Sequence, residues 1–268
     1  MTSGARRELR SSMTLEVVDS TAFMLAVSTA KGVPLESERL SVRLDGTEVA
    51  TRELDDLHGT RLQLFDTPPG LIEIEYTAVV VGRAPAAPVD ELDAITYLRP
   101  SRYVQSDSLQ PFARRTFADL QGEALVRAVG DWVFERLSYE PGSTSPTGGA
   151  VETLASGAGV CRDYAHLTAA LLRGLDMPAR LVSVYAPQLT PPDFHAVVEA
   201  LVDGRWVVVD STRLAPRRGM VRMATGRDAT DTAFLTNTLA DIHLRELRVT
   251  ATADEILTDD PDELIELG

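Results

Sequence analysis

The chain has one cysteine among its 268 residues, and its surroundings favour a nucleophile. Cys161 directly precedes residues 163–173, whose apolar residues have helical spacing and end at Gly174. We therefore expect Cys161 at a helix N-terminus, where unpaired backbone N–H groups and the positive end of the helix dipole favour a thiolate. Gly157 and Gly159 permit a tight turn before the helix, and such a turn would leave the sulfur accessible.

A histidine and an aspartate lie on two valine-rich runs that flank Asp203-Gly204, a strong signal for a two-residue hairpin turn. With these two residues in the turn, strand pairing places His195 opposite Thr212. Asp210 is then a diagonal neighbour of His195 on the same face, with Cβ atoms roughly 7–8 Å apart or less. An imidazole and a carboxylate can hydrogen-bond over that separation. A register error of one residue would put them on opposite faces.

Cys161, His195 and Asp210 together are the parts of a nucleophile, base and orienting group. An imidazole suits proton transfer near neutral pH and can hold a thiolate as an ion pair, while the carboxylate fixes its tautomer. Cys161 would attack an acyl carbon, and His195 would protonate the leaving amine and then activate the acceptor. The backbone N–H of Cys161 is one candidate oxyanion donor, and the sequence does not identify a second.

Each candidate also has a structural interpretation. A single cysteine beside an apolar helix is commonly a buried small hydrophobe, and an aspartate after a strand is commonly a turn former. His166 is a rival base, but five helical residues turn it roughly 140° away from Cys161. The four histidines show no metal-ligand spacing and no acidic loop has the calcium-site pattern, so no cofactor or metal is expected.

Composition narrows the class of protein. Hydrophobic content of 44 % and charged content of 25 % are typical of a soluble globular protein. A net charge of −14 disfavours nucleic acid and anionic lipid as partners. One cysteine cannot form an intramolecular disulfide, and neither a signal peptide nor a membrane-spanning run is evident. We therefore expect a cytoplasmic protein that binds neither nucleic acid nor membrane.

The rest of the chain predicts two domains of different class. Residues 13–82 alternate in the manner of strands, with turn signals at Asp45-Gly46 and at residues 66–70, which predicts a small antiparallel β-sandwich. An alanine- and proline-rich stretch follows. We predict a sandwich domain over residues 1–85, a linker over 86–93, and a catalytic core over 94–268.

Within the core, residues 97–107 are expected to be extended, and helical spacing covers residues 116–137. Residues 254–266 form an acidic run, which is expected to be a solvated tail.

Four segments of the core together resemble the transglutaminase-like superfamily in content and order. They are Gly159-Val-Cys-Arg-Asp-Tyr-Ala-His166, Met177-Pro-Ala-Arg180, Phe194-His-Ala196 and Asp210-Ser-Thr-Arg-Leu-Ala-Pro216, with Trp206 between the last two. More narrowly, the chain looks like bacterial transglutaminase-like cysteine peptidases with a β-rich N-terminal domain. The resemblance implies an α+β protein, with an antiparallel β-sandwich followed by a papain-like core of helices packed on an antiparallel sheet. The family's triad maps onto Cys161, His195 and Asp210, and Ser211 replaces the proline that many relatives carry.

The resemblance implies acyl transfer from an amide through a thioester, and three functions remain open. The first is hydrolysis of a protein or peptide amide by a cysteine peptidase or amidase. The second is a transglutaminase that joins glutamine to lysine through an isopeptide bond. The third is a binding module without catalysis. The sequence gives neither the substrate nor the oligomeric state.

Overall fold

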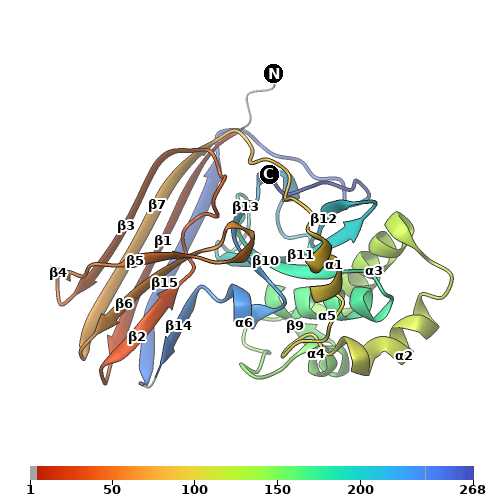
Figure 1. The fold of residues 1–268 in the computed structure, drawn as a ribbon, viewed down its shortest axis with the longest axis horizontal. Helices are drawn as coiled ribbons and strands as arrows, with labels where there is room; N and C mark the ends of the chain where they lie inside the picture. Colours follow the sequence, from red (N-terminus) through yellow and green to blue (C-terminus); the bar gives the residue numbers. More distant parts are fainter. Residues whose placement is uncertain (1–4, 239) are drawn as a thin grey trace.

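The computed structural model describes residues 5–238 and 240–268. Two packed sheets form one side of the molecule, and a helical region with a smaller sheet forms the other (Figure 1). No helix in these residues is long and apolar enough to cross a membrane.

The first side is an antiparallel sandwich, as predicted. One sheet has the strand order β15-β1-β7-β3-β4, and the other has the order β14-β2-β6-β5. The strands are β1 (Arg6–Val17), β2 (Thr21–Leu25), β3 (Leu35–Leu44), β4 (Thr47–Glu48), β5 (Arg52–Asp55), β6 (Arg61–Thr67), β7 (Gly70–Val81), β14 (Leu235–Thr238) and β15 (Ile242–Ala253). Alternate residues of β1 and β7 are buried, which is the pattern that fills a core between two sheets. Phe23 and Phe65 stack within it, with ring centroids 5.0 Å apart.

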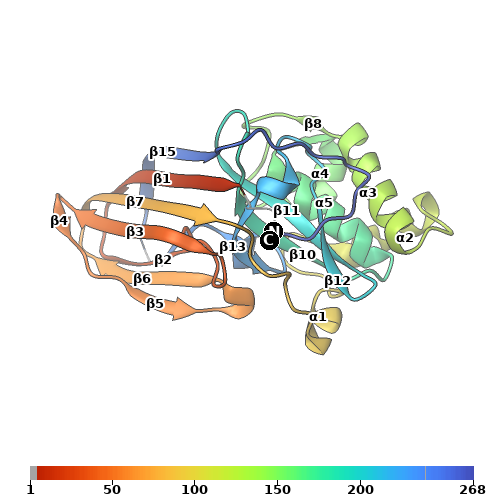
Figure 2. The same ribbon diagram turned by 90° about the horizontal axis from the view of Figure 1, so that it is seen from above.

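The sandwich takes strands from both ends of the chain, which differs from the predicted division at residue 94. β15 pairs with β1 from Arg7↔Ala253 to Val17↔Ile242, and β14 pairs with β2. Figure 2 shows β15 running beside β1. Without β15, the long strand β1 would expose one unpaired edge. Local patterning does not reveal this partner because it lies at the far end of the sequence.

The second side is built around one antiparallel sheet and one central helix. The sheet has the order β12-β11-β10-β13. Its strands are β10 (Ala179–Tyr185), β11 (Phe194–Val202), β12 (Arg205–Val209) and β13 (Val221–Gly226), and a short pair is formed by β8 (Ser138–Tyr139) and β9 (Ala158–Gly159). The helices are α1 (Glu91–Thr96), α2 (Ser106–Thr116), α3 (Gly122–Arg136), α4 (Ala150–Ser156), α5 (Cys161–Gly174) and α6 (Ala229–Thr232). Residues 163–174 of α5 are all buried, so α5 is the core helix around which the others pack.

The segment before this core is more helical than the sequence predicts. α1 begins at Glu91, inside the predicted linker, and α2 replaces the end of the segment expected to be extended. Pro111 lies inside α2, and proline in a helix interior argues against a helix when only local propensity is considered. The helix predicted over residues 116–137 corresponds to α3, which begins later than predicted, at Gly122, after α2 has ended at Thr116.

The acidic run over residues 254–266 was expected to be solvated, but the structure docks it on the core. Asp259 accepts a 2.7 Å hydrogen bond from Nε of Arg217, whose side chain is buried. The backbone N–H of Val208 donates to the carbonyl of Ile265 at 2.8 Å, and Ile265 is 6 % exposed. A buried arginine needs a carboxylate partner, and the apolar residue within the acidic run provides a second anchor.

Candidate active site

α5 begins at Cys161, as predicted, and a short turn closes its N-terminus. The carboxylate of Asp163 accepts a 2.8 Å hydrogen bond from the backbone N–H of Val160, which satisfies a free donor before the helix. Gly159 permits this contact, because a Cβ on it would lie 2.6 Å from the Cβ of Asp163. Gly157 adopts a left-handed conformation with φ of 69° where α4 ends. The glycines therefore set the turn that presents the cysteine.

The hairpin has the predicted register. Val202 pairs with Arg205, and Asp203 and Gly204 have φ values of 48° and 73°, as a two-residue hairpin turn requires. β12 ends at Val209, so Asp210 directly follows the strand. The strand pairing therefore stops before Thr212, the residue predicted to lie opposite His195.

His195 and Asp210 meet as their diagonal placement predicts. Nε2 of His195 lies 2.9 Å from Oδ2 of Asp210. The two residues are 2 % and 8 % exposed, so their ion pair is shielded from water.

Thr212 holds the other oxygen of the aspartate. Its backbone N–H and its hydroxyl donate to Oδ1 of Asp210 at 2.9 and 2.7 Å. Ser211, which replaces the family's proline, hydrogen-bonds through its hydroxyl to the hydroxyl of Thr168 on α5 at 2.7 Å. The turn after β12 is thus tied to the central helix, and both carboxylate oxygens of Asp210 have partners. The sequence places Thr212 near His195 but does not reveal its contact with Asp210.

The sulfur of Cys161 approaches the same imidazole. Nδ1 of His195 is buried and has no hydrogen-bond partner among the described residues, so it is the ring atom left to face the thiol. Burial lowers the pKa of His195, but the charge and hydrogen bond of Asp210, followed by those of Cys161, outweigh it and raise the pKa to about 10. Burial raises the pKa of Asp210, and the His195 charge and the hydrogen bonds from His195 and Thr212 more than reverse this, holding the pKa below its usual value. At neutral pH the pair is therefore an imidazolium and a carboxylate.

Tyr139 is a residue of this site that the sequence did not reveal. β8 runs parallel to β9 and pairs Tyr139 with Gly159, directly before the cysteine turn. The tyrosine hydroxyl lies near the backbone of Cys161, and burial, followed by the charge of Cys161, raises the pKa of Tyr139 to about 12. Its ring packs against Tyr164 of α5, with centroids 6.0 Å apart. Only the pairing of β8 with β9 brings these groups together, and neither strand is long enough to be recognised from its pattern.

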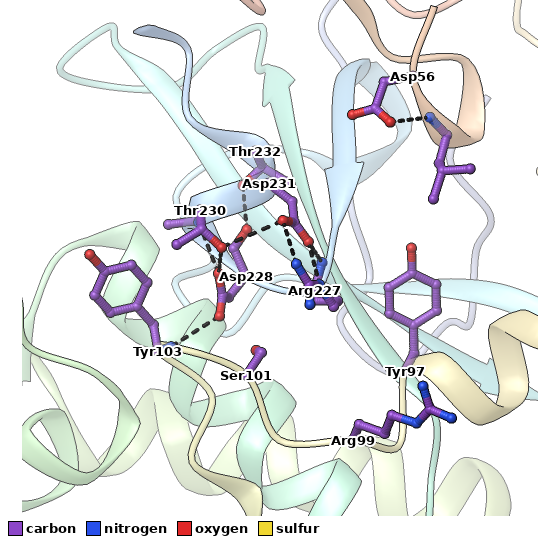
Figure 3. A network of polar contacts seen from close by, with 12 residues as sticks. Asp56, Tyr97, Arg99, Ser101, Tyr103, Arg227, Asp228, Thr230, Asp231 and Thr232 are labelled. Atoms are coloured by element: carbon purple, nitrogen blue, oxygen red, sulfur yellow. Dashed lines mark hydrogen bonds and ion pairs between the residues drawn. The ribbon is translucent and has the colours of Figure 1, made fainter. Parts of the chain in front are cut away.

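His166, the rival base, belongs to a different network. Its Nε2 accepts a 3.1 Å hydrogen bond from the backbone N–H of Ala229, and its ring stacks on Tyr103 at 5.2 Å. Burial lowers its pKa to about 3, so the ring is neutral. Figure 3 shows the adjoining network, in which Asp228 accepts hydrogen bonds from the backbone of Tyr103 and from Thr230. His166 therefore packs the loop that leads into α6, as its position around the helix predicts.

Metal ligands do not cluster at this site. No group of three or more His, Cys, Asp or Glu side chains with the geometry of a metal site occurs within residues 5–238 and 240–268.

Comparison with known proteins identifies the family. The model of the transglutaminase-like superfamily matches residues 111–211. A solved structure of a "putative cysteine protease" from Cytophaga hutchinsonii is 32 % identical and has a TM-score of 0.87, with 96 % of this chain and 93 % of that chain covered. The chain belongs to the transglutaminase-like superfamily. The predicted family and the predicted α+β fold class are thereby confirmed.

Two further similar proteins are more distant. An uncharacterized protein of Mycobacterium leprae is 26 % identical to this superfamily member, with 82 % of this chain and 91 % of that protein covered. The periplasmic domain of TgpA from Pseudomonas aeruginosa is 18 % identical with a TM-score of 0.40, which is too low to support an argument.

Proposed function

We propose that the protein is a cysteine peptidase or amidase that hydrolyses an amide bond through a thioester on Cys161. The observation that carries the proposal is the state of His195. Nε2 of this residue is 2.9 Å from Asp210 and its pKa is raised to about 10, so a proton is present on the ring beside the thiol at neutral pH. Membership of a cysteine-based catalytic family supports the same conclusion.

In the first half of the reaction, the thiolate of Cys161 attacks the carbonyl carbon of the amide, and a C–S bond forms as the carbonyl oxygen becomes an oxyanion. His195 then transfers the proton on Nδ1 to the amide nitrogen. The C–N bond breaks, the amine leaves, and a thioester remains with a neutral imidazole.

In the second half, Nδ1 of His195 takes a proton from water while the water oxygen attacks the thioester carbon. The C–S bond breaks, the carboxylic acid product leaves, and the thiolate and imidazolium are restored. Asp210 remains ionised throughout, keeps Nε2 as a donor and stabilises the positive ring.

Tyr139 supplies the oxyanion donor that the sequence left unidentified. Its hydroxyl lies near the backbone of Cys161, whose N–H is the other expected donor. With substrate bound, the phenolic O–H and this N–H would both point at the developing oxyanion. A tyrosine whose pKa is raised to about 12 keeps its proton over the working pH range and remains a donor.

The substrate proposed is a protein or peptide amide, and the compartment proposed is the cytoplasm. The net charge of −14 makes a nucleic acid an unfavourable partner. Cys161 is only partly buried whereas His195 is 2 % exposed, so the substrate carbonyl reaches the sulfur from the cysteine side.

Activity-based profiling tests the proposal. A panel of peptide-based acyl probes is incubated with the wild-type protein and with Cys161→Ala, and the labelled peptide is identified by mass spectrometry. We expect one label per chain, on Cys161, and none on the variant. The same peptides, now as ordinary amides without the reactive acyl group, are then incubated with the protein in water enriched in ¹⁸O. A fluorescent primary amine is present as a competing acceptor.

One ¹⁸O atom in the new carboxyl group is expected. Transfer of the amine to a glutamine peptide in place of ¹⁸O uptake would assign a transglutaminase. A folded wild-type protein that no probe labels would contradict a catalytic role and support a binding module.

A further inference from the structure

A cavity separate from the candidate active site lies where the sandwich, the core and the linker meet. It has a volume of about 330 Å³ and lies away from the catalytic residues. Residues 84–88 form one wall as they cross from β7 toward α1 (Figure 1). Most of the walls are apolar, and they include Ala30, Val33, Val221 and Leu267. The cavity is within the size range of small-molecule sites, about 300–1,000 Å³.

The charged side chains that line this cavity are all basic, and the terminal residue Gly268, which lies beside the guanidinium of Arg83, also forms part of its wall. Lys31 pairs with Asp55, and Arg222 pairs with Glu199, so their charges are compensated. Arg7, which is 3 % exposed, differs from Lys31 and Arg222 in its partners.

Among residues 5–238 and 240–268, the guanidinium of Arg7 has no carboxylate partner. Nη1 of Arg7 donates to the carbonyl of Gly219 at 3.4 Å, Nη2 donates to the carbonyl of Gly82, and Nε has no partner. Burial, followed by the charge of Arg83, lowers the pKa of Arg7 from its usual value. A buried charge without a counterion is unfavourable, and a guanidinium fork is well matched to a carboxylate.

A second cavity, of about 320 Å³ beside Asp210, provides a comparison. Its arginines each have a carboxylate partner. Arg217 pairs with Asp259 at 2.7 Å, Arg127 pairs with Glu123 at 3.5 Å, and Arg213 pairs with Asp131. Of these two cavities, the one beside Arg7 is therefore the one with an arginine that lacks a carboxylate partner among the described residues.

We propose that the cavity beside Arg7 binds a small organic anion with one carboxylate and an unbranched apolar body. The carboxylate would supply the missing counterion of Arg7, and the apolar body would lie against the alanine, proline, valine and leucine walls. No member of the triad lines this cavity, so the proposal does not depend on the proposed catalytic function.

Isothermal titration calorimetry of the full chain with sodium octanoate tests this site. We expect saturable binding of one octanoate per chain. Octan-1-ol, which has the same apolar body without charge, should bind at least about tenfold more weakly, because it cannot neutralise the guanidinium. Equal affinities for the two ligands would overturn the proposal.

Two variants locate the octanoate. Arg7→Met removes the charge with little change in side-chain length, and we expect at least about tenfold weaker binding. Arg10→Met is the matched control, because Arg10 lies on the same strand but is exposed and pairs with Glu75. It should bind octanoate as the wild type does.

A third variant covers the case in which Arg7→Met does not fold. Val33→Trp fills the cavity from its wall while Arg7 is retained, and binding should be lost. Wild-type affinity in a folded Arg7→Met or Val33→Trp protein, or no saturable octanoate binding by the wild type, would refute the site.

Discussion

Strand β11 carries two buried ionic groups that differ in one chemical respect. Near its start, His195 pairs with Asp210 at 2.9 Å. Further along, Glu199 pairs with Arg180 at 2.7 Å and also with Arg222. Both residues of the first pair are buried, and so are Glu199 and Arg180 in the second group. The partner of the carboxylate is an imidazole in one group and a guanidinium in the other.

The second group is a permanent structural connection. Burial raises the pKa of Glu199, but the charges of Arg222 and Arg180 outweigh this and hold it below its usual value. Arg180 stacks over Trp206 at 3.9 Å, and its NH1 lies 3.3 Å from Nδ1 of His58, which belongs to the sandwich side. Guanidinium groups do not release their proton in proteins, so this cluster joins the two halves without exchanging protons.

One strand therefore carries two buried ion pairs, of which one is suited to structure and the other to the proposed chemistry. An imidazole can give up and recover its proton, and its free nitrogen faces a thiol. Variants of the His195–Asp210 pair should therefore lose turnover, whereas variants of the Glu199 group should lose stability.

The largest expected effect is on turnover in Asp210→Asn. We expect kcat to fall by about 10⁴-fold, because the amide neither stabilises the imidazolium nor fixes the tautomer. Steady-state kinetics with the best amide substrate measures this. Glu199→Gln is the control, and its folded fraction should keep kcat within a few-fold of wild type. A similar loss of kcat in both variants would remove the distinction between the two groups.

Glu199→Gln should instead reduce the free energy of unfolding, by about 3–5 kcal/mol, because it removes the carboxylate shared by Arg222 and the buried Arg180 and leaves Arg180 only Asp93, at 3.5 Å. Urea denaturation at neutral pH measures the change. Glu246→Gln removes the partner of Arg248 in an exposed ion pair and should change the free energy by roughly 0–1 kcal/mol. If the two losses are equal, the Glu199 cluster does not have the proposed structural role.

Tyr139→Phe refines the catalytic side of the comparison. Loss of the phenolic O–H should lower kcat by about 10²-fold through weaker oxyanion stabilisation, while the urea midpoint should change little. Unchanged kcat would leave the Cys161 backbone N–H as the sole proposed donor.

The pH dependence gives the smallest and most specific effect. The folded-state pKa of His195 is raised to about 10, so the general acid is present at neutral pH and is lost as the pH rises through about 10. We expect kcat/KM to fall about tenfold per pH unit above that value. The contribution of His195 to stability should likewise be complete below its unfolded pKa of about 6.5 and be lost as the pH rises through about 10. In Asp210→Asn the alkaline fall should begin at lower pH, and an unshifted profile would contradict the assignment to His195.

The sequence predicts the hairpin register, the contact of His195 with Asp210 and the start of α5, because local rules determine each of them. Asp203-Gly204 determines the hairpin register, which in turn determines the diagonal contact of His195 with Asp210. The glycines before Cys161 and the apolar spacing after it predict the start of α5.

Features that depend on distant pairing were missed. The contact of Tyr139 with Cys161 requires the pairing of β8 with β9, and the place of β15 in the sandwich requires its pairing with β1. The docking of the acidic run depends on the buried cation Arg217, which composition does not reveal. In each case the decisive partner lies outside the window over which propensity and periodicity act.

The rate of alkylation of the sulfur tests the central claim most directly. Cys161 is the single cysteine of the chain, so uptake of iodoacetamide followed by mass spectrometry reports on one atom. At neutral pH we predict one label per chain and a rate at least about tenfold higher in the wild type than in folded His195→Ala, because the imidazolium stabilises the thiolate. Equal rates in the two proteins would contradict the account, because His195 would then have no influence on the sulfur.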